Sequence, residues 1–319
     1  MANLICGVDV SAKTLDARIG RDGAYQRFDN NPDGIAALAE FCHQHGADLV
    51  VVEATGGYER QTYALLWAKD VPCAIVNPRS VRRFAQAMGL LEKTDRIDSG
   101  VIAWYGEIKR IVAQQPASQA QQELEAAATL LRQLVDEQTC LRNQGRLVTD
   151  SFASRLRTKV LAALAQAIRE CEQRIIELID TDPLWRELDV EFRTIKGVAR
   201  RTSARMLAEL PEIGTISNKA IGKLAGLAPL ADDSGQRKGI RRIHGGRANV
   251  RSILYMSAGV AGKHEPDFIA FRDRMTAAGK PKMVTRTALA HKLLTRLNAK
   301  AREVRQRLTA AAAAVPAAA

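Results

Sequence analysis

Four acidic residues in the first hundred positions have the types and the spacing of a metal-binding site. Asp9 lies in the apolar stretch ICGVDV and Glu53 in LVVVEA, where an unpaired carboxylate would be costly to bury. Asp95 and Asp98 are three residues apart, so on a helix they project from one face. Four converging carboxylates need cations to remain ionised, and their hard oxygens select Mg²⁺ or Mn²⁺. Two such ions can activate a nucleophile and stabilise the leaving oxygen of a phosphodiester, so the pattern predicts phosphoryl transfer.

Alternating strands and helices are expected to position these acids. Three antiparallel strands are predicted first, then helix, strand, helix and strand, and finally two helices that bracket Asp95. The ranges before those two helices are Leu4–Val10, Leu15–Ile19, Ala24–Phe28, Asp33–His45, Asp48–Glu53, Tyr58–Lys69 and Cys73–Val76. The order resembles the RNase-H-like (RuvC-like) α/β fold, whose first and fourth strands are neighbours, so Asp9 and Glu53 would lie close together. Each acid also has an ordinary explanation when taken singly, because Asp95, for example, could N-cap the helix Arg96–Ile111.

The remainder of the chain is predicted to be mainly helical. From Ser118 to about Leu188, apolar residues recur at three-four spacing, which indicates a coiled-coil-like helical connector. An intramolecular hairpin and a dimer satisfy this spacing equally, and the dimer is slightly favoured. We therefore expect a catalytic domain over residues 1–115, a helical connector over 116–190, a mainly α-helical domain over 191–308 and a disordered, alanine-rich tail over 309–319.

Positive charge is concentrated in the C-terminal part. The chain carries 47 Lys and Arg against 35 Asp and Glu, a formal charge of +12. Lys and Arg dominate between Arg193 and Arg307, which is typical of a surface that binds nucleic-acid phosphates. Ile195–Ala199, followed by a helix over Thr202–Leu210, resembles a helix-hairpin-helix element, although a plain helix-loop-helix is the alternative. In such an element a phosphate would be held by Lys196, Gly197, Arg200 and Arg201.

A polar segment between Pro229 and Arg251 is predicted to be a loop that exposes Ser234. Cations near this serine could stabilise a phosphoryl transition state. Serine is common in loops, so composition alone would not single it out. His244 could accept a proton, but a solvated or phosphate-contacting histidine is the stronger interpretation. Further nucleic-acid contacts are expected at Arg237, Lys238, Arg241, Arg242, Arg247, Lys280 and Lys282.

Seven segments resemble, in order and spacing, the insertion sequence one-ten family of transposases, which includes the one-triple-one subgroup and the Piv/MooV DNA invertases. Four lie in its catalytic domain: GVDVSAK, VVEATGGYER, VNPRSVRRFAQAMG and KTDRIDSGVIAWYG. Three lie in its second domain: IKGVARRTSARMLAEL, LAGLAPLADDSGQRKGIRRIHGGRANVRSILYMSA and AGKPKMVTRTALAHKLL. The matches extend from about Ile5 to Leu294. The segment GGRANVRSIL departs from many relatives, which carry more arginine there.

The resemblance implies a DEDD tetrad at Asp9, Glu53, Asp95 and Asp98, in agreement with the prediction from the residues. It implies that Ser234 attacks DNA and forms a 5′-phosphoserine link, with the two domains supplied by different subunits of a dimer or tetramer. It also implies DNA and a noncoding bridge RNA as partners, and a function as a mobile-element recombinase in the prokaryotic cytoplasm, associated with the nucleoid.

Other function classes remain open at this stage. A Holliday-junction-type endonuclease would use the same tetrad with water as the nucleophile, and an inactive nucleic-acid-binding protein would share the charge. Five cysteines without a C-x-x-C pair argue against a disulfide framework or a thiolate zinc site and favour a reducing cytoplasm. No apolar run approaches the length of a membrane span, so no membrane partner is expected.

Overall fold

The computed structural model describes residues 4–90, 95–147, 149–231, 233–235 and 239–313, and the side chains of 95, 96, 146, 312 and 313 also lie outside the description. The chain forms two compact units, Met1–Ala117 and Ser118–Ala319, each of which is described by itself. Among the described residues, no helix is long and apolar enough to cross a membrane.

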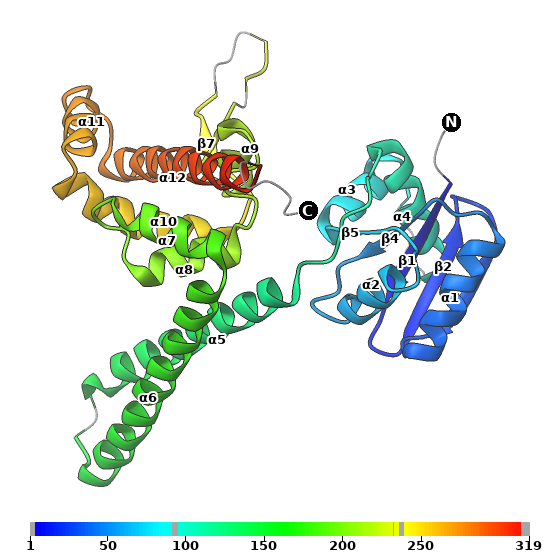
Figure 1. Ribbon diagram of the computed structural model, residues 1–319, viewed down its shortest axis with the longest axis horizontal. Coiled ribbons are helices and arrows are strands. Elements are labelled where there is room, and N and C mark those ends of the chain that lie inside the picture. The colour runs from blue at the N-terminus through cyan, green and yellow to red at the C-terminus, as the bar shows by residue number, and fades with distance from the viewer. Residues whose placement is uncertain (1–3, 91–94, 148, 232, 236–238, 314–319) are drawn as a thin grey trace, which may run out of the picture. The chain divides into compact units, whose positions relative to one another are not determined.

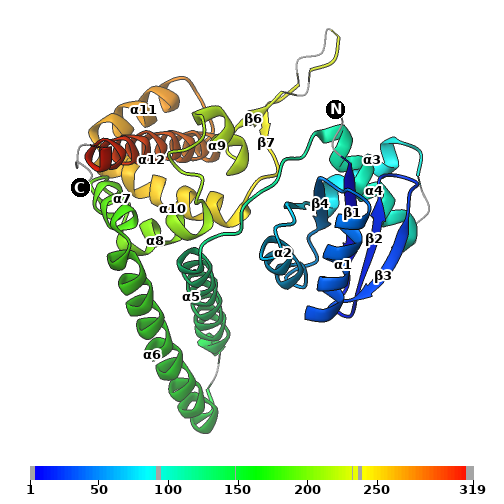
Figure 2. The ribbon, with the colours of Figure 1, turned by 45° about the vertical axis from the view of Figure 1, so that its right-hand side comes forward.

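The N-terminal unit is built on a five-stranded sheet with the order β3-β2-β1-β4-β5. β1 pairs antiparallel with β2 and parallel with β4, so the expected neighbourhood of the first and fourth strands is confirmed. β3 extends the antiparallel edge (Figure 2), and β5 extends the parallel edge (Figure 1). The strands are Ile5–Val10 (β1), Thr14–Ile19 (β2), Tyr25–Asp29 (β3), Leu49–Glu53 (β4) and Cys73–Val76 (β5).

Two cores cover the two faces of this sheet, because side chains alternate between faces along each strand. Cys6, Val8 and Val10 pack in one core with α1 (Pro32–Gln44) and α2 (Glu59–Trp67). Ile5, Leu49 and Val51 pack in the other with α3 (Pro78–Ala87) and α4 (Asp95–Lys109). Figure 2 shows these two helices beside the sheet. Asp9 is four residues after Ile5 on β1, and Glu53 is four residues after Leu49 on β4. Both acids therefore lie on the face of the sheet that α3 and α4 cover.

The second unit begins with a helical hairpin. α5 (Gln119–Gln144) and α6 (Ser151–Thr181) are joined through the short 3₁₀ helix η1 (Gly145–Leu147) and pack along each other. Their apolar residues form one core with the helices that follow, and the Cys171 thiol donates to the carbonyl oxygen of Ala127 at 3.1 Å. The apolar residues in the first half of α5 and the second half of α6 therefore pack within the chain. At this end of the hairpin they need no second subunit, although the sequence slightly favoured a dimer.

The rest of this unit packs around one long helix, α12 (Lys282–Ala313), which runs along α7 and α10 (Figure 1). A two-stranded ladder of β6 and β7 precedes α10. The remaining elements are Pro183–Arg193 (α7), Arg200–Glu209 (α8), Asn218–Leu224 (α9), Pro229–Leu230 (β6), Arg242–Ile243 (β7), Ala248–His264 (α10) and Pro266–Ala277 (α11).

Two predictions in this unit need correction. The tail was expected to be disordered from residue 309, but α12 continues through Ala313 because alanine is the strongest helix former. Residues 314–319 lie outside the described residues. The segment from Pro229 to Arg251 is not entirely loop, because the ends of its polar stretch pair as β6 and β7 and its last residues begin α10 at Ala248.

Candidate active site

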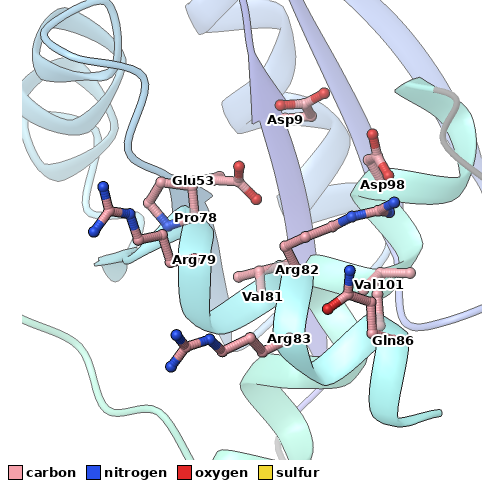
Figure 3. A pocket seen from close by; sticks show the side chains of 11 residues that line it. Asp9, Glu53, Pro78, Arg79, Val81, Arg82, Arg83, Gln86, Asp98 and Val101 are labelled. Atoms are coloured by element: carbon pink, nitrogen blue, oxygen red, sulfur yellow. The ribbon is translucent and has the colours of Figure 1, made fainter. Parts of the chain in front are cut away.

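Three of the four predicted acids face one cavity of about 530 Å³ in the N-terminal unit. Asp9 comes from β1, Glu53 from the end of β4 and Asp98 from the first turn of α4 (Figure 3). Val8 and Val52 are register partners in the parallel pair, so Asp9 and Glu53 follow at the same level of adjacent strands. The topology therefore brings together carboxylates that are 44 and 45 positions apart in the chain.

A glycine allows α4 to approach β1 closely enough to bring Asp98 to this cavity. A Cβ at Gly7 would lie 2.1 Å from the carbonyl oxygen of Ser99 and 2.4 Å from the amide nitrogen of Ala103. Both atoms belong to the backbone of α4, so the helix lies directly against the strand. The absence of a side chain at residue 7 thus sets the separation between the strand of Asp9 and the helix of Asp98.

The loop that follows Glu53 is held by another carboxylate, that of Glu59, which is 8% exposed. Its Oε2 accepts hydrogen bonds from the Thr55 amide at 3.0 Å, the Thr55 hydroxyl at 3.1 Å and the Gly57 amide at 2.8 Å. Burial raises the pKa of Glu59, but the hydrogen bonds from its own backbone, Thr55 and Gly57 outweigh burial and leave the pKa below its ordinary value. Glu59 therefore positions the end of β4, and the motif VVEATGGYER has a structural reason beyond Glu53.

The donor set suits a hard divalent cation, because the cavity offers carboxylate oxygens and no described thiol or imidazole lines it. Within the described part of the chain, no three His, Cys, Asp or Glu side chains form a group that could already hold a metal ion. The fourth predicted ligand, Asp95, is the first residue of α4, and its side chain lies outside the described residues. The chemistry of the donor atoms therefore fits a divalent metal ion, and metal binding in this cavity stays a prediction.

Arginines of α3 line the same cavity and were not among the predicted site residues. Arg82 extends toward Asp98, whereas Arg79 and Arg83 point away from the three acids (Figure 3). The helix starts at Pro78, where the Asn77 side chain accepts a hydrogen bond from the amide of Arg79 at 2.9 Å. The sequence does contain a pattern that could have indicated this basic helix face. The spacing i, i+3, i+4, i+7 is followed by Arg79, Arg82, Arg83 and Gln86.

A fifth acid stands beside the cavity. Asp16 on β2 is the register partner of Asp9 and is 3% exposed. It accepts hydrogen bonds from the Tyr25 hydroxyl and, at 2.8 Å, from Nε of Arg27. The hydrogen bond to Asp16 raises the pKa of Tyr25. Because a guanidinium already neutralises it, Asp16 is a structural acid rather than a further metal ligand.

Ser234 is exposed in the segment between β6 and β7 of the second unit. The neighbouring Asp233 contacts the residues before β7, because it accepts hydrogen bonds from the Gly239 amide at 3.0 Å and from Arg241 at 3.4 Å. Gly235 adopts a positive φ of 54°, which glycine tolerates better than other residues. The accessibility expected for Ser234 is therefore seen, while Arg237 and Lys238 lie outside the described residues.

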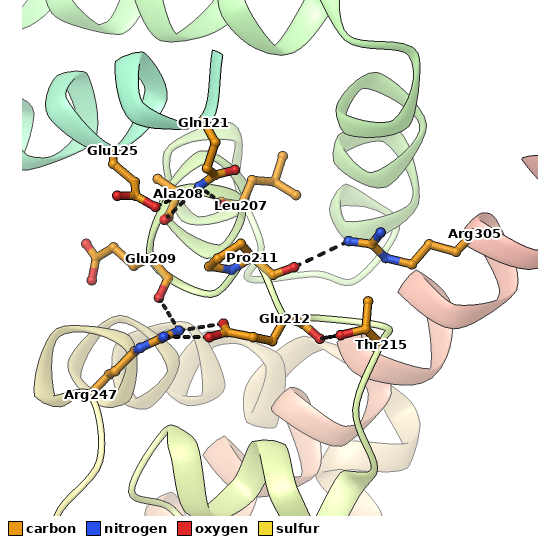
Figure 4. Close-up of polar contacts among 10 residues, drawn as sticks. All are labelled: Gln121, Glu125, Leu207, Ala208, Glu209, Pro211, Glu212, Thr215, Arg247 and Arg305. Carbon is orange, nitrogen blue, oxygen red and sulfur yellow. Dashed lines mark hydrogen bonds and ion pairs between the residues drawn. The ribbon is translucent and has the colours of Figure 1, made fainter. Parts of the chain in front are cut away.

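Some of the cations expected to contact nucleic acid make ion pairs within their unit. Arg247 donates to both carboxylate oxygens of Glu212 at 2.6 Å and to the carbonyl oxygen of Glu209 at 3.0 Å (Figure 4). Arg200 pairs with Asp180 at 2.7 Å, and Arg201 pairs with Glu172. Their roles toward nucleic acid stay predictions.

The other predicted contacts lie at three places. Lys196 and Gly197 form the turn between α7 and α8, and Gly197 has a φ of 100°. A Cβ at Gly197 would lie 2.7 Å from the carbonyl oxygen of Ser257. Arg241 and Arg242 line one cavity with Ile240 and Ile243, and Lys280 and Lys282 line a separate cavity.

Comparison with known proteins assigns the class and then the family. Residues 6–152 match the transposase family named for the DEDD signature of IS110, and residues 190–273 match the family described as transposases of the IS116/IS110/IS902 family. The first match covers the strands and helices that carry the acids, and the second covers the segment that carries Ser234. The protein is thus of the DEDD transposase class. The chain belongs to the IS110 family of transposases, as the order of its motifs indicated.

Two curated relatives span nearly the full chain. The pilin gene-inverting proteins of Moraxella bovis and Moraxella lacunata are each 27% identical over 310 residues, which cover 92% of this chain and 94% of each relative. Among solved structures, Thermus thermophilus RuvC in complex with a Holliday junction substrate is similar with a TM-score of 0.24 and 14% identity, over 31% of this chain and 90% of that one. A second RuvC structure has a TM-score of 0.25. Both TM-scores are low, and the order and pairing of the five strands define the fold of the N-terminal unit.

Proposed function

We propose that this transposase cuts and rejoins DNA strands through a covalent link to Ser234, with divalent metal ions held by the acidic tetrad. One observation carries the proposal: Asp9, Glu53 and Asp98 face one cavity although they come from three separate elements. Carboxylates gathered in this way repel one another unless cations lie between them.

Asp9, Glu53, Asp95 and Asp98 would hold the metal, either Mg²⁺ or Mn²⁺ and as two ions. When bound, the ions would lower the charge on the reacting phosphodiester and favour the alkoxide form of the attacking hydroxyl. The four acids hold and space these charges. Arg79 and Arg83 on the rim can contact the phosphates on either side of the reacting one, because a guanidinium binds phosphate oxygens in pairs.

Ser234 would supply the nucleophile. Its Oγ forms a bond to the phosphorus while the bond from phosphorus to the 3′ oxygen of the DNA breaks. The proton lost by Oγ is balanced by the proton gained at the departing 3′ oxygen. The phosphodiester energy is kept in the 5′-phosphoserine ester, so a 3′ hydroxyl can reverse the step on another strand without an external energy source. Water as the nucleophile would instead leave two free ends.

The basic second unit would bind the nucleic acids. A noncoding bridge RNA, which the family resemblance implies, would select the target and donor DNA. The turn at Lys196 and Gly197 would hold a phosphate as a helix-hairpin-helix does, since a helix N-terminus with free amides attracts anions. Apolar side chains are exposed where α5 ends and α6 begins, at Leu147, Phe152 and Val160. Such exposure supports assembly into a dimer or tetramer. Such an assembly would act in the prokaryotic cytoplasm, close to the nucleoid.

Titration calorimetry with Mg²⁺ and Mn²⁺ tests the metal centre. We expect Asp9→Asn and Glu53→Gln to weaken divalent-ion binding at least tenfold and to abolish cleavage of a matched DNA substrate supplied with its guide RNA. Asp22→Asn is the control, because Asp22 is an exposed acid on the turn after β2 with a side chain 84% accessible. Equal ion binding in wild type and both cavity variants would contradict the assignment.

A further inference from the structure

A second cavity, in the C-terminal unit, is lined by several cationic side chains. It measures about 540 Å³ and lies between α10, α11 and the start of α12. None of the described residues that line it is acidic. Five of them are cationic: Lys263, Arg272, Lys280, Lys282 and Arg286.

The two arginines are fixed in place by backbone carbonyls. Arg272 donates to the carbonyl oxygen of Gly262 at 2.8 Å and pairs with Asp273, which is outside the lining, at 2.7 Å. Arg286 donates to the carbonyl oxygen of Tyr255 at 3.0 Å. A Cβ at Gly259 would lie 2.6 Å from the guanidinium of Arg286, so the glycine leaves room for that group. Both guanidinium groups are thereby ordered before any ligand binds, and ordering them in advance reduces the entropy lost on binding.

One buried polar atom in the lining has no protein partner. Thr285 is 5% exposed, and its Oγ1 makes no hydrogen bond to any described residue. Burying a hydroxyl without a partner is unfavourable, so a ligand that hydrogen-bonds to Oγ1 of Thr285 would remove this cost. Its backbone amide is already used, because it donates to the carbonyl oxygen of Pro281 at 3.0 Å.

The start of α12 adds a further attraction for anions. The helix is 32 residues long and has no acidic residue in its first turn. The amides of a first helical turn have no acceptor within the helix, and they carry the positive end of the helix dipole. Lys282, at this end of α12, is exposed and lines the cavity together with the buried Thr285.

We propose that this cavity binds one backbone phosphate of a nucleic acid. The inference rests on the proposed function for the choice of nucleic acid over a free anion, and it assigns that contact to Thr285, Lys282 and the fixed arginines. A phosphodiester has one negative charge and two free oxygens, which accept from a hydroxyl and from guanidinium groups. DNA and RNA offer this same group, so the probe has to distinguish them.

The test measures binding of labelled duplex DNA and, separately, of labelled single-stranded RNA to the full chain by fluorescence anisotropy without divalent ions. Thr285→Val removes the hydroxyl and keeps the shape. We expect it to weaken binding of the preferred probe about tenfold, the order of one hydrogen bond to a charged group. Its melting temperature should equal or exceed that of wild type, because the lost hydroxyl had no protein partner. Thr285→Ser keeps the hydroxyl and should bind within about twofold of wild type.

Charge is tested with Lys282→Gln against Lys219→Gln, an exposed lysine on α9 outside the cavity. Lys282→Gln should reduce the slope of log affinity against log salt by about 0.7 to 0.9, as loss of one phosphate contact predicts, and the control should not. Wild-type affinity in Thr285→Val, or equal effects of the two lysine variants, overturns the inference and leaves the metal centre and Ser234 unaffected. Failure of wild type to bind either probe overturns this inference and the proposed function together.

Discussion

Gly7→Ala tests whether close contact between β1 and α4 builds the acidic cavity. The added methyl would lie 2.1 Å from a backbone oxygen of α4, whereas ordinary contact begins at 3.4 Å. The strand and the helix must therefore separate by about 0.9 Å to reach 3.0 Å, the shortest distance that real Cβ atoms show, and by about 1.3 Å to reach ordinary contact. Since Asp98 lies on α4 and Asp9 on β1, the spacing of these carboxylates changes with it.

Two magnitudes follow from this displacement. Overpacking of this kind costs about 1–3 kcal/mol of stability, so the N-terminal unit should remain folded but melt a few degrees lower. A shift of about 1 Å in a catalytic group can reduce a rate roughly a hundredfold. The loss of DNA cleavage should therefore far exceed what the small loss of folded protein explains.

Thermal unfolding, divalent-ion calorimetry and cleavage of a matched DNA substrate are measured on the same preparations. Gly46→Ala is the matched control, because Gly46 has a φ of 66° and no atom within 4 Å of an added Cβ. It should cost about 1 kcal/mol through backbone strain and leave ion binding and cleavage unchanged. If Gly7→Ala lost stability but bound ions and cut DNA like the control, the reasoning about α4 would be refuted.

Three further outcomes are expected. Glu59→Gln should destabilise the N-terminal unit by about 1–3 kcal/mol at pH 7. The pKa of Glu59 is lowered in the fold, so its ionised carboxylate stabilises the fold above the ordinary pKa of 4.5, and this stabilisation is lost as pH falls through the lowered pKa. The difference in melting temperature between Glu59→Gln and wild type should therefore shrink below pH 4, and a constant difference would contradict this. Phe152→Ser with Leu156→Ser, at side chains 58% and 45% exposed, should lower the molar mass in light scattering without unfolding the chain, and an unchanged mass would exclude this surface from assembly. Arg247→Met should cost about 1–3 kcal/mol in urea unfolding because Glu212 loses its partner, whereas unchanged stability would leave Arg247 free for a phosphate.

The strands and the acids could be predicted because they follow local rules. Apolar stretches predicted the strands of Asp9 and Glu53, and the order of elements, which resembles the RNase-H-like fold, made these two strands neighbours. Cys73–Val76 was predicted with the bounds that the structure has. Asp98 could be placed on a helix by its spacing from Asp95. What brings that helix to the strand is the packing at Gly7, which no periodicity reveals, because a glycine in a strand has several possible reasons.

Nonlocal packing also explains what was missed. The arginine face of α3 is visible as a spacing, but only the fold shows that it borders the acids. The stripe on α5 and α6 satisfies a hairpin and a dimer alike, so the pairing within the chain needed the structure. Arg247 looked like a phosphate contact because its partner Glu212 is 35 residues away in the sequence.

Identification of the covalent adduct tests the central proposal most directly. Wild type, divalent ions, a matched DNA substrate and its guide RNA are quenched and separated on a denaturing gel. We predict a protein–DNA species that protease removes, which mass spectrometry maps to Ser234 and which Ser234→Ala lacks while still folding and binding ions. An alanine variant that still recombines DNA, or an adduct at Ser203, Ser217 or Ser252, would contradict the serine assignment.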